Sequence, residues 1–288
     1  MAYMARLDQR NPSNAPGTWF VDTRCIDCGT CRELAPTLFE ARGELSIVAA
    51  QPEGEEAWRD AWRAAFACPT QSIGAIGHPA RRKNDPYPEP LGHGVYALGH
   101  NSELSYGADS FLVVRPSGNL LIDSPRAAGG MLDSIEGLGG VADVLLTHQD
   151  DVADAEQFAT RFGARVWIHE HDRAAAPFAS DLVLGSDPVD VATDVRAIPV
   201  PGHTRGSVVY VVDELICFSG DSLAWSHERT DLTAFRGACW YDWSTQLRSL
   251  AHLADAAQFS MLLPGHGTRV TLPHEEMHDR LLALVARG

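Results

Sequence analysis

The chain has 288 residues, a length that favours two domains and is sufficient to bury a sizeable core. Hydrophobic residues make up 45% of it and charged residues 21%, which is typical of a soluble globular protein. A net charge of −15 argues against nucleic acid and against an anionic membrane surface as the main partner.

The amino-terminal stretch is polar and does not look like a targeting segment. Residues 1–17 carry two prolines and predict a loose arm. Residues 1–10 lack the apolar core and the cleavage pattern of a signal peptide. No run in the chain approaches 18 apolar residues, so we expect no membrane-spanning helix.

The most specific pattern in the chain is a run of closely spaced cysteines. Cys25, Cys28 and Cys31 follow C-x2-C-x2-C spacing, at which successive thiolates wrap one iron–sulfur cube. In two-cluster proteins a cysteine before proline serves the other cluster, but here that place reads Ala35-Pro36. Cys68, which precedes a proline, completes one set of four thiols. The triplet that would build a second cluster is absent, because its places hold Trp58, Ala61 and Ala64.

These thiols resemble those of a single-cluster bacterial [4Fe-4S] ferredoxin domain, over residues 18–78. The resemblance implies a [4Fe-4S] cluster held by Cys25, Cys28, Cys31 and Cys68. Structural zinc is the competing interpretation, since four thiolates also suit zinc, but the spacing is not that of a zinc ribbon. A cluster that oxidising compartments would threaten predicts a cytoplasmic protein, in which a disulfide between these cysteines is disfavoured.

A helix and a linker follow the cysteine motif. Residues 53–66 are rich in alanine and place Trp58, Trp62 and Phe66 on one apolar helical face. We expect these aromatic side chains to pack the helix on the small core of this domain. Residues 79–90 contain four prolines and predict a semi-rigid linker to a second domain at 91–288.

The second domain shows short apolar runs punctuated by glycine and proline, which predict strands. Strand pairs followed by helices, twice over, predict an α+β fold in which two sheets pack face to face with helices outside. The predicted helices are 131–138, 154–162, 245–255 and 275–286. The predicted strands are 95–98, 110–114, 119–123, 144–146, 166–168, 195–200, 207–212, 215–218 and 260–263.

Four loops of this domain each deliver a histidine or an aspartate just after a strand. They contain His148, His203, Asp221 and His266. A metal site is often assembled in this way from distant parts of a sequence. The order and the signatures of these loops resemble the metallo-β-lactamase fold, an αββα sandwich. The resemblance also implies that Asp123 orients a ligand from the second shell.

The chain departs from that family where a second metal would bind. Members usually carry H-x-H-x-D-H, whereas this chain reads His148-Gln149-Asp150-Asp151-Val152-Ala153. The resemblance implies that Asp150 replaces the second histidine. The side chains of Val152 and Ala153 cannot ligate, although an aspartate and a histidine stand at these places in the family. We therefore expect one mononuclear site, with its ligands drawn from His148, Asp150, His203, Asp221 and His266.

The metal and part of its ligand set stay open. Two imidazoles with one or two carboxylates suit iron, and zinc or manganese also fit. Asp151 or Asp154 is a substitute ligand in an alternative interpretation, although Asp154 more simply caps the following helix. His169 and His171 form another H-x-H pair, and His171 is a further candidate. His266 either ligates or serves as a proton donor or substrate contact.

Three classes of function agree with these features. In the first, a redox enzyme passes electrons between the cluster and the mononuclear metal, and acts on a small molecule. In the second, a metal-dependent hydrolase of the ester or thioester type carries a structural cluster. Val152 counts against hydrolysis, because the aspartate usual at that place orients the attacking water. In the third, a non-enzymatic electron-transfer or scaffold protein retains a decayed metal site.

The redox class is favoured because hydrolysis moves no net electrons. A short linker raises the effective concentration of the cluster beside the metal. We expect the loop 25–31 to face the mouth of the metal site, within one chain or across a homo-oligomer. In this interpretation His266 and Asp221 are the catalytic residues, and a redox partner protein exchanges electrons with the cluster.

Overall fold

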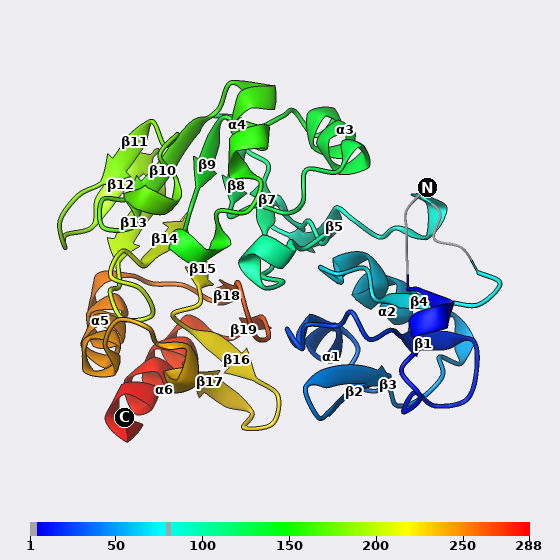
Figure 1. Cartoon of the computed structure of the whole chain (residues 1–288). Coiled ribbons are helices and arrows are strands. Elements are labelled where there is room, and N and C mark those ends of the chain that lie inside the picture. Colours follow the sequence, from blue (N-terminus) through cyan, green and yellow to red (C-terminus); the bar gives the residue numbers. More distant parts are fainter. Residues whose placement is uncertain (1–4, 79–81) are drawn as a thin grey trace.

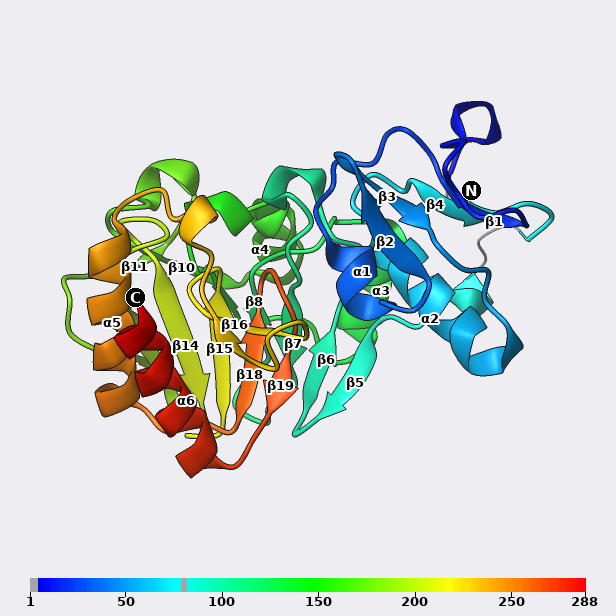
Figure 2. The same cartoon turned by 90° about the horizontal axis from the view of Figure 1, so that it is seen from below.

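The computed structural model describes residues 5–78 and 82–288. Figure 1 shows a small amino-terminal unit, drawn in blue and cyan, beside a larger two-sheet sandwich. Figure 2 shows the same two units from below, with the small unit lying against one end of the sandwich. Within the described ranges, no helix is long and apolar enough to cross a membrane.

The small unit has two short antiparallel strand pairs and two helices. One pair joins its amino-terminal strand to its carboxy-terminal strand, and the other is a hairpin. The helix α2 is longer than α1 and begins one residue later than its sequence predicts. The elements are β1 (Trp19–Val21), α1 (Thr30–Leu34), β2 (Phe39–Arg42), β3 (Leu45–Val48), α2 (Gly54–Ala67) and β4 (Ile73–Ala75).

Aromatic side chains hold α2 on the core of the small unit. The Trp19 ring on β1 meets the rings of Trp58 and Trp62 edge to face, with centroids 5.4 and 4.8 Å apart. Phe66 continues the row, with its ring centroid 5.9 Å from that of Trp62. Edge-to-face pairs of this kind add to the energy of area burial. The predicted role of the three α2 aromatics as packing residues is therefore confirmed.

The described part of the amino-terminal arm is not loose, contrary to the prediction for residues 1–17. Asn14 is buried, and its amide donates to the Val21 carbonyl oxygen and accepts from the Val21 and Val48 N–H groups. One side chain thus bridges β1 and β3, because an asparagine amide offers both donors and an acceptor. Residues 1–4 lie outside the described residues.

The predicted linker at 79–90 is only partly a linker. Residues 79–81 lie outside the described residues, and Glu89 and Pro90 already belong to strand β5 (Glu89–Gly92). Tyr87 is buried, and its hydroxyl donates to the Arg63 carbonyl oxygen of α2. The Arg63 guanidinium also lies 3.0 Å from the Glu89 carboxylate. The end of this segment therefore packs the two units together.

The first sheet of the sandwich has seven strands in the order β11-β10-β9-β8-β7-β6-β5. The strands from β5 to β8 pair antiparallel, and those from β8 to β11 pair parallel. Beyond β5, its members are β6 (Val95–Ala97), β7 (Phe111–Val113), β8 (Leu120–Ile122), β9 (Asp143–Leu145), β10 (Arg165–His169) and β11 (Asp181–Val183). The helices α3 (Gly129–Gly137) and α4 (Ala155–Phe162) belong to this half.

The second sheet has six strands in the order β12-β13-β14-β15-β18-β19. Its members are β12 (Val189–Ala192), β13 (Val195–Pro199), β14 (Val208–Val212), β15 (Ile216–Gly220), β18 (Met261–Pro264) and β19 (Val270–Thr271). The helices α5 (Trp243–Ala256) and α6 (His274–Arg287) cover its outer face. A small hairpin, β16 (Ala224–Ser226) with β17 (Asp231–Thr233), was not predicted from the sequence.

The two sheets share one apolar core, in keeping with the predicted face-to-face packing. Phe111 of β7 and Phe218 of β15 meet across it with ring centroids 5.5 Å apart. Tyr210 of β14 is fully buried, and its hydroxyl donates to the Leu146 carbonyl oxygen just beyond β9. A second core, which includes Leu250 and Leu281, lies between the second sheet and α5 and α6. The predicted αββα sandwich is confirmed.

We expect Phe218→Ala to lower the free energy of unfolding by about 3–5 kcal/mol, because it leaves a cavity between the sheets. Leu282→Ala on α6 is the matched control, since that side chain is 40% exposed and its loss should change stability by less than about 0.5 kcal/mol. Denaturant unfolding measures both. Equal effects of the two substitutions would contradict the position of Phe218 in the shared core.

Candidate metal centre and cluster site

The four predicted cluster thiols come from both ends of the small unit. Cys25 and Cys28 lie in the loop before α1, Cys31 lies on α1, and Cys68 directly follows α2. The loop wraps tightly, since Asp27 and Gly29 have φ of 59° and 88°. The Ser46 N–H donates to Cys25 Sγ over 3.4 Å, and the Ser72 N–H donates to Cys68 Sγ over 3.3 Å.

The donor set fits an iron–sulfur cluster. Burial raises the pKa of the Cys28 and Cys31 thiols, and it raises the pKa of Cys68 to about 11. Each of these three thiols is further disfavoured as a thiolate by the neighbouring cysteines. Several buried thiolates need a cationic partner, and backbone N–H groups directed at sulfur are one of the factors that tune an iron–sulfur cluster.

His148, in the loop after β9, is held by a chain of hydrogen bonds. The Thr147 N–H donates to the Asp123 carboxylate over 2.8 Å, and the Thr147 hydroxyl lies 2.9 Å from its other oxygen. That hydroxyl is also 3.0 Å from His148 Nδ1. When Thr147 donates its proton to Asp123, it accepts from Nδ1–H, which leaves the Nε2 lone pair free. Asp123 therefore orients the His148 ring through Thr147, the role that the resemblance implied for it.

His203 lies in the loop after β13, and its Nε2, like that of His148, is the ring nitrogen left without a hydrogen-bond partner among the described residues. Its Nδ1 is 2.6 Å from the Ala238 carbonyl oxygen, which can only accept, so Nδ1 carries the proton. The N–H groups of Trp240 and Tyr241 both donate to the His203 carbonyl oxygen. The segment before α5 thus fixes this loop, and Nε2 of His203 points toward His148.

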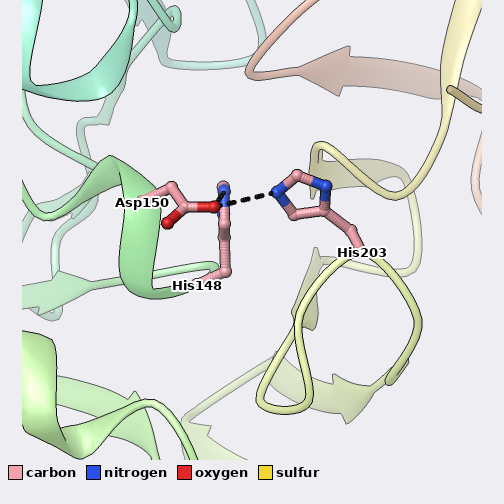
Figure 3. A group of neighbouring side chains, drawn as sticks. All are labelled: His148, Asp150 and His203. Atoms are coloured by element: carbon pink, nitrogen blue, oxygen red, sulfur yellow. Dashed lines mark ion pairs between the residues drawn. The ribbon is translucent and has the colours of Figure 1, made fainter. Parts of the chain in front are cut away.

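Figure 3 shows the Asp150 carboxylate beside these two imidazoles. Its Oδ2 lies 3.3 Å from His203 Nε2 and 3.9 Å from His148 Nε2. Both Nε2 atoms are buried and lack a hydrogen-bond partner within the described structure. Burial also lowers the pKa of His148 to about 4, which keeps the ring neutral. Neutral imidazole nitrogens without a partner, beside a carboxylate, are the expected state of metal ligands.

Asp151 and Asp221 form a second donor group with His148. Asp151 is buried, and its Oδ2 lies 3.8 Å from His148 Nδ1 and lacks a hydrogen-bond partner among the described residues. A Cβ added at Gly265 would lie 2.9 Å from both Asp151 Oδ2 and Asp221 Oδ1. Burial raises the pKa of Asp151 well above its ordinary value, and the charges of Asp221 and Asp123 add to the rise. Among the substitute ligands considered from sequence, Asp151 is the one placed at the site.

His266 is paired with Asp221 rather than directed at the other two histidines. Its Nδ1 is 2.9 Å from Asp221 Oδ1, and its Nε2 is 3.4 Å from the Tyr106 carbonyl oxygen. Burial opposes a charge on this ring, but the Asp221 carboxylate outweighs it and raises the pKa of His266 to about 9. The pair with Asp221 thus favours the protonated form of His266 next to the donor atoms. Its membership of the ligand set stays a prediction.

The other alternative ligands lie elsewhere. Asp154 precedes α4 but makes no side-chain cap, and its carboxylate accepts from the Ala127 N–H over 2.7 Å instead. β10 ends at His169, and His171 lies in the turn beyond it. Nε2 of His169 bonds the Gly185 carbonyl oxygen. Neither His171 nor Asp154 belongs to a donor group in the part of the chain that the structure describes.

Asp172 has a supporting role that sequence reasoning missed. It is buried, and its carboxylate accepts from the Thr204 hydroxyl over 2.6 Å and from the N–H groups of Gln149 and Gly206 over 3.0 Å each. One carboxylate therefore ties the His148 loop to the His203 loop. No spacing in the sequence points to this role, because it depends on loops that are distant along the chain.

One cleft of about 1780 Å³ connects the two predicted centres. Cys28 and Thr30 of the small unit line it together with His203, Asp221 and His266 of the sandwich. Between the units, the Thr268 hydroxyl donates to the Glu33 carboxylate, and the Thr30 hydroxyl donates to the Gly107 carbonyl oxygen over 3.0 Å. Trp240 stands at the rim of the cleft, 66% exposed, with its ring centroid 6.2 Å from that of His203.

Comparison with protein families divides the chain at the same place. The family model described as the metallo-beta-lactamase superfamily matches residues 95–286. The model described as the 4Fe-4S single cluster domain of ferredoxin I matches residues 21–75.

Relatives among characterised and uncharacterised proteins match parts of the chain. A hydroxyacylglutathione hydrolase of Acidiphilium cryptum is 34% identical over 118 residues, which is 40% of this chain and 48% of the relative. The chain thus spans about half the length of that enzyme. An uncharacterized protein of Mycobacterium bovis is 29% identical over 204 residues, which is 58% of this chain and 88% of the relative.

Solved structures share the fold of the sandwich. The metallo-β-lactamase TMB-1 superposes with a TM-score of 0.53 at 16% identity, covering 69% of this chain and 96% of that one. FIM-1 from Pseudomonas aeruginosa, in its mono-zinc form, gives 0.51 at 19% identity, with coverage of 69% and 93%. The chain belongs to the metallo-β-lactamase superfamily, and a single-cluster [4Fe-4S] ferredoxin domain precedes its superfamily domain.

Proposed function

We propose that this protein is a redox enzyme in which a [4Fe-4S] cluster on Cys25, Cys28, Cys31 and Cys68 exchanges electrons with a metal on His148, Asp150 and His203. The observation that carries the proposal is the shared cleft, which Cys28 lines together with His203, Asp150 and His266. A cluster that only stabilised the small unit would have no need to face a metal centre.

The donor set favours iron at the second centre. His148, Asp150 and His203 supply two imidazoles and one carboxylate, the combination found in non-haem iron sites with open positions. Zinc has no redox chemistry and would serve only a hydrolase. When bound, the cluster would supply one electron at a time, an iron held by these three residues would be able to accept it, and a one-electron donor protein would reduce the cluster again.

Residues around the two centres hold the ligand loops in place and supply a proton. Thr147 and Asp123 fix the His148 ring, and Asp172 fixes the loops on either side of the site. His266, charged beside Asp221, holds a proton next to the cleft. Electron gain by a substrate is commonly balanced by a proton, so His266 is the expected proton donor. The cleft admits a small-molecule substrate.

A hydrolase is the second candidate, and the similarity to a hydroxyacylglutathione hydrolase favours it. The local sequence opposes it, because Val152 and Ala153 stand where the family places an aspartate and a histidine. Asp151 reaches the same region with a buried carboxylate. Hydrolysis would therefore depend on Asp151, whereas electron exchange requires the cluster.

The redox proposal is tested by loss of the cluster. In the wild-type protein, oxidised and loaded with iron at both centres, a limiting one-electron reductant should reduce the mononuclear iron through the cluster. In Cys68→Ser the ferric signal of that iron should persist under the same conditions, as followed by electron paramagnetic resonance. Equal reduction in both proteins, together with thioester hydrolysis indifferent to redox state, would overturn the proposal in favour of the hydrolase.

Iron content tests the assignment of the thiols. We expect Cys68→Ser to lose the brown colour and about four irons per chain, because a single-cluster site requires all four thiolates. Cys217→Ala is the matched control, since Cys217 is fully buried in β15 and should leave the cluster intact. A colourless wild-type protein with one zinc on these thiols would refute the assignment.

The hydrogen-bond chain behind His148 gives a separate test. Thr147→Val keeps the shape of the side chain but removes the hydroxyl between Asp123 and His148. We expect metal affinity at the second centre to fall about 10–100-fold, the usual effect of losing an outer-shell partner. Competition with a chelator measures it, and Thr271→Val on the exposed strand β19 is the control. An unchanged affinity in Thr147→Val would show that His148 does not hold the metal.

A further inference from the structure

A two-residue bend in the sandwich lies between the two predicted centres. Tyr106 and Gly107 follow the short 3-10 helix at Glu103–Ser105, and both have left-handed backbone, with φ of 51° and 91°. Asn101 stabilises the bend, because its side-chain amide donates to the Gly107 carbonyl oxygen over 2.7 Å and to the Asp109 carboxylate over 2.8 Å.

One side of the bend contacts the cluster loop. The Tyr106 hydroxyl donates to the Ile26 carbonyl oxygen over 2.6 Å, between the first two cluster cysteines. The Thr30 hydroxyl donates to the Gly107 carbonyl oxygen. Gly107 itself lies against Cys28, since a Cβ added there would be 3.0 Å from Cys28 Sγ and 3.1 Å from the Pro69 ring.

The other side of the bend contacts the metal centre. The Tyr106 carbonyl oxygen accepts from His266 Nε2 over 3.4 Å, and the two rings have centroids 6.2 Å apart. His266 Nδ1 in turn contacts Asp221, 2.9 Å away. Two residues beyond Gly107, the Asp109 N–H donates to the Gly265 carbonyl oxygen over 2.7 Å, which fixes the loop that carries His266.

A continuous path therefore runs from Cys28 through the Gly107 and Tyr106 backbone to His266 and then Asp221, whose Oδ2 lies 3.7 Å from Nε2 of the proposed ligand His203. Thr30 bridges the first step, because its Oγ1 lies 3.4 Å from Cys28 Sγ and donates to the Gly107 carbonyl oxygen. The later steps are covalent bonds, hydrogen bonds and ion-pair contacts. Such contacts transmit electrons better than an open gap of the same length. The absence of a side chain at Gly107 is what lets the backbone approach Cys28 so closely.

We propose that the Tyr106–Gly107 bend is the electron route between the cluster and the metal centre, with Tyr106 and Gly107 as positioning residues. The proposal rests on the proposed redox function. One electron leaves the cluster, which a one-electron donor protein had reduced, and it passes along the bend to the ferric iron, which becomes ferrous. His266 retains its place at the end of the route through its bond to Tyr106.

The test compares two substitutions in the bend with two matched controls. Tyr106→Phe removes only the bond to Ile26, and Gly107→Ala forces the bend away from Cys28. Tyr96→Phe on strand β6 is the control for the first. Gly43→Ala is the control for the second, because Gly43 also has positive φ, at 65°, but a Cβ there would meet no atom within 4 Å.

Stopped-flow reduction with dithionite, under anaerobic conditions, follows the appearance of ferrous iron at the second centre after the cluster is reduced. We expect Gly107→Ala to slow this step by at least about tenfold, since displacements near 1 Å at a reacting centre can cost about 10²-fold. Tyr106→Phe should slow it by a smaller factor. Both controls should match the wild type.

A second set of measurements distinguishes a variant that has lost the electron route from one in which the cluster or the metal centre is damaged. Iron content and the midpoint potential of the cluster are measured in all four variants. Slow transfer in a variant that retains full iron content supports the bend as the route. If the wild type transfers electrons and Gly107→Ala, with all its iron, transfers them equally fast, the route is wrong and the redox function survives. If the wild type transfers none, both proposals fail.

Discussion

The close contact between Gly107 and Cys28 is the constraint on which the arrangement of the two units depends. Because no Cβ intervenes, the backbone of the sandwich reaches the cluster loop directly. Around this contact, Tyr106, Thr30, Glu33 and Thr268 make hydrogen bonds across the seam. On the far edge, Arg63 of α2 pairs with Glu89 of β5. The cluster loop is therefore fixed at the mouth of the metal cleft rather than tethered beside it.

The metal centre combines few histidines with many carboxylates. Asp123 and Asp151 lie toward Nδ1 of His148 and Asp221 lies 3.9 Å from its Nε2, and burial raises the pKa of Asp123 to about 7. A cation at the centre would offset the cost of holding such charges out of water. The His266 ring supplies part of this compensation in the structure, through its pair with Asp221. A metal that bound Asp221 would therefore share this carboxylate with His266.

Local patterns were enough to predict the fold and the thiols. The cysteine spacing is read from seven consecutive residues, and the strands of the sandwich are short apolar runs punctuated by glycine and proline. Predicted boundaries differ from the observed ones by one or two residues, as in α4, which begins at Ala155 rather than Asp154. The side-chain packing of Trp58, Trp62 and Phe66 follows from their helical spacing.

Features that depend on distant contacts could not be predicted. The arm was expected to be loose because its composition is polar. Its structure depends on Asn14, whose side-chain oxygen accepts from backbone N–H groups of β1 and β3. Proline content suggested a spacer at 79–90, but Tyr87 and Glu89 pack against α2. The roles of Asp172, Tyr106 and Gly107 arise only when loops far apart in the chain meet. The ligand set itself stays a prediction, although the structure brings His148, Asp150 and His203 together.

Magnetic interaction between the two centres tests the central claim most directly. The protein is loaded with its cluster and with either paramagnetic iron or diamagnetic zinc at His148, Asp150 and His203, and the cluster is reduced anaerobically. Electron paramagnetic resonance then compares the signal of the reduced cluster in the two samples. The account predicts a broadened, faster-relaxing signal when iron occupies the second site, because the centres share one cleft. Identical signals in both samples would contradict it.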